Sequence, residues 1–154
     1  MTRNTAVLAL AFCVGVVTAA SAADQQIGTW KLNESKSKIV AGATKNHTVV
    51  YEVAGDNIKV TVDGVDGTGN AIHSEWVGKF DGKDYPLKGD PTSDTRAYTR
   101  VDDHTLTLTQ KKGGKLTTSG RIVIAADGKS RTVTTDVTDA QGQKVSTTAV
   151  YDRK

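Results

Sequence analysis

From residue 24 onward, the chain consists of short runs rich in Val, Ile, Thr and Tyr, separated by turn-forming Gly and Asp residues. Examples of these turn signals are Gly55-Asp56, Asp81-Gly82, Gly113-Gly114 and Asp127-Gly128. When the turn signals between these examples are included, most successive signals lie 10 to 14 residues apart. Gly-containing pairs allow the positive φ angles that tight hairpin turns require. The pattern therefore predicts a series of antiparallel hairpins with no long helix.

Ten strands are expected, and several alternate apolar with polar residues. Ile58, Val60 and Val62, for example, fall on one face of a strand, opposite Lys59 and Thr61. Threonine is β-branched yet tolerates water, so its 22 copies suit the outer faces of such strands. The predicted strands are 27–33, 46–54, 57–63, 71–80, 83–88, 94–101, 104–112, 115–125, 129–138 and 143–152.

An open sheet of ten strands would leave two long edges and an exposed apolar face. Closure into an up-and-down barrel removes the edges and buries that face. A β-sandwich is the alternative, but sandwiches usually need longer crossover connections, and only Glu34 to Lys45 is long enough to serve as one. We therefore expect an all-β fold, an antiparallel meander of about ten strands closed as a barrel.

The first 23 residues have the pattern of a secretory signal peptide. Arg3 supplies a positive start, residues 6–17 form an apolar run, and small residues precede Asp24. The run is too short for a bilayer span, which needs roughly 20 residues. Cys13 follows Phe12, which is too large for a lipid-attachment box. We expect cleavage after Ala22 or Ala23 and a secreted or periplasmic protein.

Length and composition leave room for one domain, residues 24–154, and exclude several classes. The formal charge is only +3 and the basic residues are spread along the chain, which is not typical of nucleic-acid binding. The single Cys lies in the predicted signal segment, so the mature chain holds no disulfide or thiolate metal site.

The mature chain opens with Ile27-Gly28-Thr29-Trp30, and a G-x-W at the start of the first strand resembles the lipocalin signature. The resemblance implies that Gly28 permits close packing and that Trp30 plugs one end of the barrel, with Arg153 packing over it. Four further segments, 81–86, 94–96, 127–134 and 149–152, resemble secreted bacterial lipocalin-like proteins of the calycin superfamily. This chain departs from typical lipocalins in having no C-terminal helix and no disulfide pair.

The strand 94–101 carries the most informative polar residues. If Arg96 and Tyr98 point inward, they place a guanidinium and a phenol in the cavity, and fatty-acid-binding relatives hold a carboxylate in this way. Arg121, opposite Ile122 in its own strand, could join them. In the other arrangement, which we favour, Ala97 and Val101 fill the core and the arginines lie in solvent.

The aromatic residues give the second group of candidates. Tyr51, Trp76 and Phe80 are expected either to fill the core or to line a pocket. Core and lining are the same residues in a small barrel, so both interpretations stay open. The candidate ligand-binding residues are Tyr51, Trp76, Arg96, Tyr98 and Arg121.

No nucleophile elbow, zinc-protease motif, P-loop or dinucleotide fingerprint is present. The histidines, His47, His73 and His104, are expected on strand surfaces, and the alternative is a metal or haem site that uses His73 or His104. We therefore expect no catalytic residues, no metal and no cofactor.

The sequence thus favours a small-molecule-binding barrel for an apolar or amphipathic ligand, with a carboxylate if Arg96 points inward. The alternative is a filled barrel that acts as a structural or interaction module of the cell envelope. No nucleic acid and no membrane span are expected, and the oligomeric state is left open.

Overall fold

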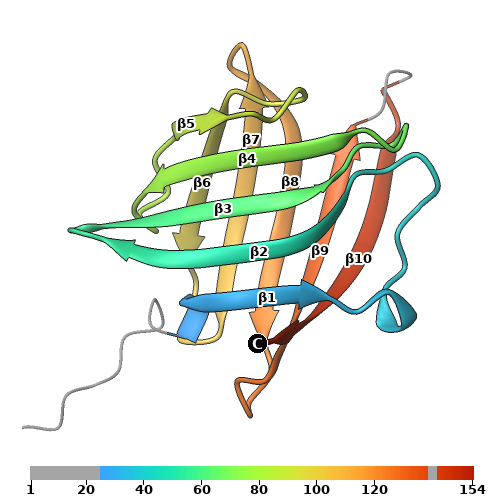
Figure 1. The fold of residues 1–154 in the computed structure, drawn as a ribbon. Helices are drawn as coiled ribbons and strands as arrows, with labels where there is room; N and C mark the ends of the chain where they lie inside the picture. Colours follow the sequence, from blue (N-terminus) through green and yellow to red (C-terminus); the bar gives the residue numbers. More distant parts are fainter. Residues whose placement is uncertain (1–24, 139–141) are drawn as a thin grey trace, which may run out of the picture.

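The computed structural model describes residues 25–138 and 142–154 and forms a ten-stranded closed barrel (Figure 1). The predicted signal peptide lies outside the described residues. The strands are β1 (Gly28–Leu32), β2 (Lys45–Ala54), β3 (Asn57–Val65), β4 (Ala71–Gly78), β5 (Tyr85–Lys88), β6 (Thr95–Arg100), β7 (Thr105–Lys112), β8 (Lys115–Ile124), β9 (Ser130–Thr138) and β10 (Lys144–Arg153). The prediction of an all-β meander is confirmed.

Each strand pairs antiparallel with its neighbours in the chain, and β1 closes the ring by pairing with β10 as well as β2. Trp30 marks this closure, because it lies opposite Val49 on one side and Arg153 on the other. In the described residues every strand has a paired neighbour on both sides, which is the physical reason for favouring a barrel over an open sheet. Strand β5 is the shortest partner, with two residue pairs on each side.

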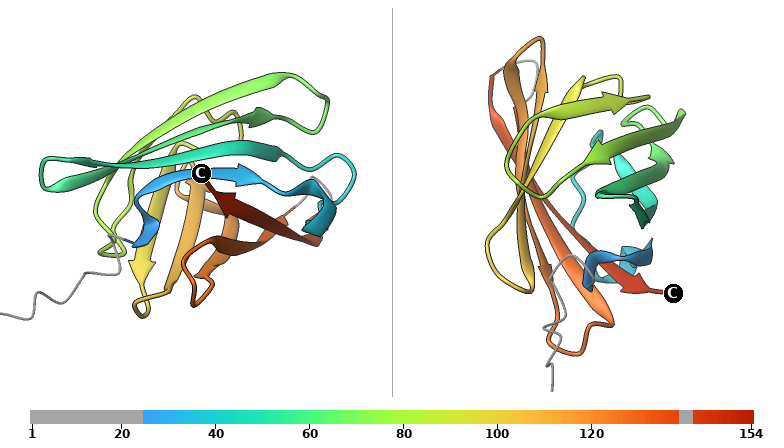
Figure 2. Two further views of the ribbon diagram at one scale, coloured as in Figure 1. Left: turned by 60° about the horizontal axis from the view of Figure 1, so that its bottom comes forward. Right: turned by 90° about the vertical axis from the view of Figure 1, so that its left-hand side faces the viewer.

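A meander places alternate connections at opposite ends of the barrel, as the views in Figures 1 and 2 show. We call the end that holds the β1–β2, β3–β4, β5–β6 and β7–β8 connections the open end, and β9 ends and β10 begins at this end. The end that holds the β2–β3, β4–β5, β6–β7 and β8–β9 connections and the C terminus is the closed end. Trp30, Phe80 and Tyr85 lie toward the closed end and pack with the buried residues of the core.

The β1–β2 connection contains the one named helix of the described residues, a 3-10 turn over Glu34–Lys36 that the sequence analysis did not predict. Asn33 caps it, because its side-chain oxygen accepts hydrogen bonds from the Lys36 backbone N–H and the Ser35 hydroxyl. The chain then forms an isolated bridge between Lys38 and Thr148 before it reaches the open end.

Two glycines let this connection approach the β3–β4 hairpin closely. A Cβ on Gly64 would lie 2.1 Å from the Lys45 carbonyl oxygen, and one on Gly67 would lie 1.8 Å from that of Gly42. Any side chain at either position would collide with backbone. The approach brings residues 40–44 against the mouth of the barrel.

Candidate functional site

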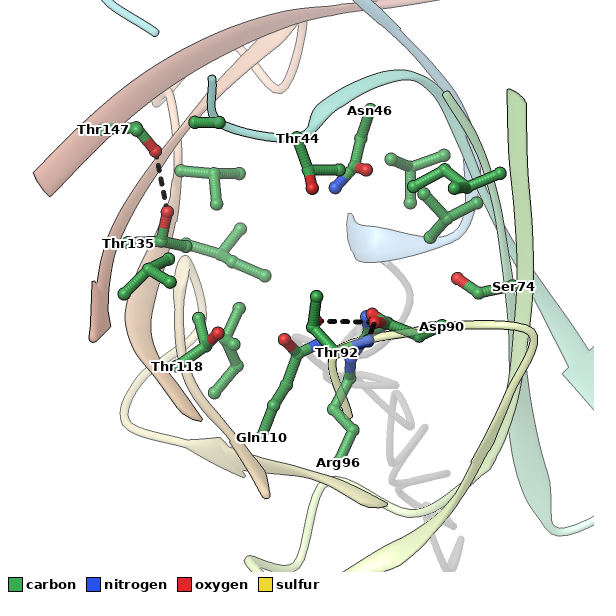
Figure 3. Close-up of a pocket in the computed structure, with 18 of the residues that line it drawn as sticks. Thr44, Asn46, Ser74, Asp90, Thr92, Arg96, Gln110, Thr118, Thr135 and Thr147 are labelled. Atoms are coloured by element: carbon green, nitrogen blue, oxygen red, sulfur yellow. Dashed lines mark hydrogen bonds between the residues drawn. The ribbon is translucent and has the colours of Figure 1, made fainter. Parts of the chain in front are cut away.

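The barrel encloses a cavity of about 480 Å³ that extends to the open end. Residues of the β1–β2 and β5–β6 connections border its mouth, and inward-facing side chains of the strands form its wall. The barrel is therefore hollow rather than filled. Figure 3 shows Arg96, Gln110, Thr118 and Thr135 projecting into this space from different strands.

The wall mixes apolar and polar groups. Its aliphatic residues are Val49, Val62, Ile72, Leu108, Ile122, Val133, Val137 and Val145. Its polar residues are Thr44, Asn46, Tyr51, Ser74, Asp90, Thr92, Arg96, Tyr98, Gln110, Thr118, Arg131, Thr135, Thr147 and Tyr151. A wall of this kind suits a ligand that has both an apolar part and polar substituents.

Arg96 points into the barrel and is only 6 % exposed. The favoured prediction is wrong for Arg96, which is buried, and for Val101, which is 51 % exposed, whereas Ala97 is buried as that prediction expected. The pairing of Arg96 with Gln110 on β7 explains the difference, since both long polar side chains reach the same cavity. Arg100, at the end of the same strand, is exposed.

Gln110 and Tyr98 hold the Arg96 guanidinium in place. The two ends of an amide are assigned from their hydrogen-bonding partners, and the Gln110 oxygen faces Arg96 in the orientation that satisfies both ends. In that orientation it accepts from Nε at 2.8 Å and from Nη2 at 2.5 Å, while its nitrogen donates to Thr118 at 3.2 Å. Arg96 Nη1 also donates to the Tyr98 hydroxyl at 3.3 Å.

Tyr98 and Tyr51 form a buried pair of phenols beside Arg96. Their hydroxyl oxygens are 3.5 Å apart and their ring centroids 6.3 Å apart. Burial raises the pKa of Tyr98 well above its usual value, against a smaller opposing effect of the Arg96 charge. The phenol therefore stays protonated at neutral pH and is able to donate a hydrogen bond to an anion.

Arg131, at the start of β9, is a second buried guanidinium that the sequence analysis missed. It borders the cavity, is 2 % exposed and lies against three aromatic rings, with its Cζ 4.7 Å from the Trp30 centroid, 4.8 Å from Tyr51 and 5.1 Å from Tyr151. Its Nη1 donates to Gln26 Oε1 at 3.3 Å. Its Nε is buried and has no hydrogen-bond partner among the described residues.

Burial also raises the pKa of the Tyr151 phenol, to about 12, although the nearby charge of Arg131 acts in the opposite direction. Like Tyr98, this phenol is a hydrogen-bond donor at neutral pH. The cavity therefore presents a protonated phenol beside each of its two guanidinium groups, Tyr98 beside Arg96 and Tyr151 beside Arg131.

Trp30 and Arg153 close the other end of the barrel. The Trp30 indole is fully buried, and its Nε1 donates to the Gln26 carbonyl at 2.9 Å. The Arg153 guanidinium lies 4.4 Å from the Trp30 centroid, which is the contact expected from the sequence resemblance. Arg153 also donates to the carbonyls of Gly128 and Ile27, both at 2.8 Å. Partial burial, together with the Arg131 charge, lowers its pKa.

Gly28 adopts a φ of +126°, which only glycine tolerates readily, and a Cβ there would lie 3.4 Å from Arg153 Nη1. The positive φ beside the Trp30–Arg153 contact is therefore the reason that this position of β1 favours glycine.

Two of the five candidate ligand-binding residues lie elsewhere. Trp76 is 1 % exposed but does not border the cavity; it packs edge-on against Tyr98, with centroids 4.8 Å apart, and its Nε1 donates to the Arg96 carbonyl at 2.8 Å. Arg121 is exposed on the outer face of β8, because Ile122 takes the inward position. The other three candidates, Tyr51, Arg96 and Tyr98, line the same cavity.

The histidines lie away from the cavity. His73 Nδ1 contacts Asp63 Oδ1 at 2.6 Å on the outer surface, and this hydrogen bond raises the pKa of His73. Within residues 25–138 and 142–154, no cluster of three or more His, Cys, Asp or Glu residues could hold a metal ion.

No helix in the described part of the chain is both long and apolar enough to cross a membrane.

Comparison with known proteins identifies no family. No family model matches the sequence, and no curated protein matches it. Among solved structures, a redesigned β-barrel, mFAP1, bound to DFHBI, is similar at 18 % identity and a TM-score of 0.46, over 87 % of this chain and all of the other.

Proposed function

We propose that this barrel binds a small amphipathic molecule whose acidic group is held by Arg96. The observation that carries the proposal is the buried Arg96 guanidinium, which faces a cavity and has a phenol and an amide as partners but no carboxylate. A guanidinium binds a carboxylate with short, charge-assisted hydrogen bonds. A volume of about 480 Å³ lies within the range of small-molecule sites, roughly 300–1,000 Å³.

The ligand's apolar part would contact the aliphatic wall formed by residues such as Val62, Leu108 and Ile122. Burial of apolar area contributes roughly 25 cal/mol per Å² before the loss of ligand freedom is counted. The acidic group then adds selectivity, because a neutral ligand would leave the buried charge of Arg96 without a counter-charge. The proposed role is binding, not catalysis.

A matched pair of ligands tests the role of the acidic group. Decanoate and decanol share a chain length and differ in charge, and we expect decanoate to bind at least about tenfold more tightly, since hydrogen bonds to charged groups contribute about 1.5–3 kcal/mol. Arg96→Met should remove this preference. Arg121→Met removes a guanidinium from the outer face and should leave it intact.

Isothermal titration calorimetry on the four combinations gives the result directly. Equal affinity for the acid and the alcohol in the unchanged protein, or a preference that survives Arg96→Met, would remove Arg96 from the binding site. Absence of saturable binding by either molecule would contradict the proposal for this class of ligand.

We further propose that the barrel acts outside the cytoplasm, after export and removal of residues 1–22 or 1–23. The support is the charge, apolar run and small residues of the N-terminal segment. Mass spectrometry of the protein from a periplasmic fraction should show a chain that begins at Ala23 or Asp24. A full-length chain found only in the cytoplasm would contradict the proposal.

A further inference from the structure

Two guanidinium groups border the same cavity, and the binding site proposed above uses only one of them. Arg96 and Arg131 are 6 % and 2 % exposed, so neither is fully hydrated. An arginine side chain keeps its positive charge in proteins. The interior of the barrel therefore carries two positive charges that the solvent screens poorly.

No carboxylate neutralises these charges among the described residues. The buried polar side chains of residues 25–138 and 142–154 include no Asp or Glu. The ion pairs seen in the described residues are formed by lysines and His73, and neither Arg96 nor Arg131 takes part in them. Arg131 is stabilised instead by aromatic rings and by the neutral amide of Gln26.

Asp90 is the one acidic residue that borders the cavity, and it lies at the mouth (Figure 3). Its Oδ1 accepts from the Thr92 backbone N–H at 2.8 Å and from the Thr92 hydroxyl at 2.7 Å. The residue is partly exposed, so water screens its charge. Asp90 therefore does not balance the positive charge of Arg131, the more deeply buried of the two arginines.

We propose that the ligand is a dianion: an amphipathic molecule with a doubly charged head, or with two acidic groups, rather than a simple monocarboxylate. This inference rests on the proposed binding function and goes beyond it by specifying the ligand's charge. Arg96 hydrogen-bonds the head group, and Arg131 attracts its second negative charge through the poorly screened interior.

The arrangement of the phenols supports this division of roles. The phenols of Tyr51 and Tyr98 connect the two guanidinium groups. The Tyr98 hydroxyl accepts from Arg96 and contacts the Tyr51 hydroxyl, and the Tyr51 ring lies against Arg131. A head group seated at these phenols is therefore near both charges. Arg131, which lies against the rings and is almost fully covered, acts chiefly by its charge.

A matched pair of alkyl anions tests the inference in the unchanged protein. Octyl phosphate is a dianion at about pH 8, because the second ionisation of a phosphate monoester has a pKa near 6. Octyl sulfate has a similar shape and a single charge. An added charge near a guanidinium, with an effective dielectric constant of about 20, should strengthen binding about tenfold or more.

A dicarboxylate arm separates the two sources of a dianion. Octylmalonate against decanoate compares a dicarboxylic with a monocarboxylic head on a similar chain. Tighter binding of either dianion than of its monoanion supports the inference, and the arm that shows it identifies the head group. Equal or weaker binding of both dianions overturns it.

Arg131→Met then assigns the preference to its cause. The variant should lower the phosphate-to-sulfate affinity ratio about tenfold while octyl sulfate still binds, and Arg121→Met should not change the ratio. Desolvation of the phosphate head acts equally on both proteins, so the change in ratio isolates Arg131. An unchanged ratio in Arg131→Met would overturn the assignment.

The outcomes also separate the two proposals. If octyl sulfate and decanoate bind but the dianions bind no better, the dianion inference fails and the proposed function stands. If none of the four molecules binds, both fail together.

Discussion

Arg131→Met should leave the ligand-free protein as stable as before, or stabilise it by about 1–3 kcal/mol. The side chain is nearly fully buried, and its Nε has no partner in the described part of the chain, which is a penalty of about 1–3 kcal/mol. Removing the charge also removes a desolvation penalty of several kcal/mol. Met fills a similar volume and gains about 1.5–3 kcal/mol from apolar burial.

The terms that oppose this gain are also visible in the structure. Three aromatic contacts are lost, each contributing about 0.5–2 kcal/mol, and Gln26 loses its charged partner, which removes about 1.5–3 kcal/mol. The two sets are of similar size, and replacement of buried charges by apolar groups elsewhere is neutral or stabilising by about 1–4 kcal/mol. We therefore expect the free energy of unfolding of Arg131→Met to equal or exceed that of the unchanged protein.

Urea unfolding followed by tryptophan fluorescence measures the change, with Arg121→Met as the control for loss of a surface arginine. A loss of more than about 2 kcal/mol in Arg131→Met alone would refute the reasoning, because the guanidinium would then be a net stabiliser of the closed end. A neutral or stabilising result would indicate that Arg131 is retained for a role other than stability.

Asp63→Asn should lower the pKa of His73 toward its ordinary value, because the hydrogen bond to Asp63 is the main cause that raises it. NMR titration of the imidazole measures this pKa. An unchanged pKa would contradict the contact between the two side chains. Because the pKa of His73 is raised in the folded state, the stabilisation from this pair is present below the unfolded pKa of about 6.5. It is lost as the pH rises through the folded-state pKa of His73. The difference in unfolding free energy between the unchanged protein and Asp63→Asn should therefore narrow with increasing pH. Gly64→Ala should destabilise the fold by about 1–3 kcal/mol, because its Cβ would meet the Lys45 carbonyl oxygen at 2.1 Å; a melting temperature equal to that of the unchanged protein would show that the β1–β2 connection moves away freely.

The barrel could be predicted from the sequence because each strand carries its own signal. Alternation in 57–63 and the Gly-containing turns at 55–56, 113–114 and 127–128 determine the hairpins locally. Closure follows from the need to bury one face and to pair both edges. The 3-10 turn at Glu34–Lys36 is too short for a periodic pattern, so only its Asn33 cap could have indicated it.

The site was only partly predictable, because the direction of a polar side chain depends on its neighbours across the sheet. In β6 the alternation places Arg96 opposite Ala97, and the small apolar Ala97 favoured the wrong face. Gln110, the cross-strand partner that satisfies the guanidinium, becomes known only with the register. Arg131 shares its face of β9 with Val133 and Thr135, so the strand pattern allowed an inward direction, but a lone basic residue at a strand start is ordinarily a surface residue.

We propose, from the cavity and its buried guanidinium groups, that the barrel holds a small acidic molecule. Native mass spectrometry of the exported protein, purified without detergent, tests it most directly. We predict a discrete added mass that is lost on denaturation, or that appears after incubation with decanoate or octyl phosphate and is absent in Arg96→Met. The bare mature mass under every one of these conditions would contradict the claim.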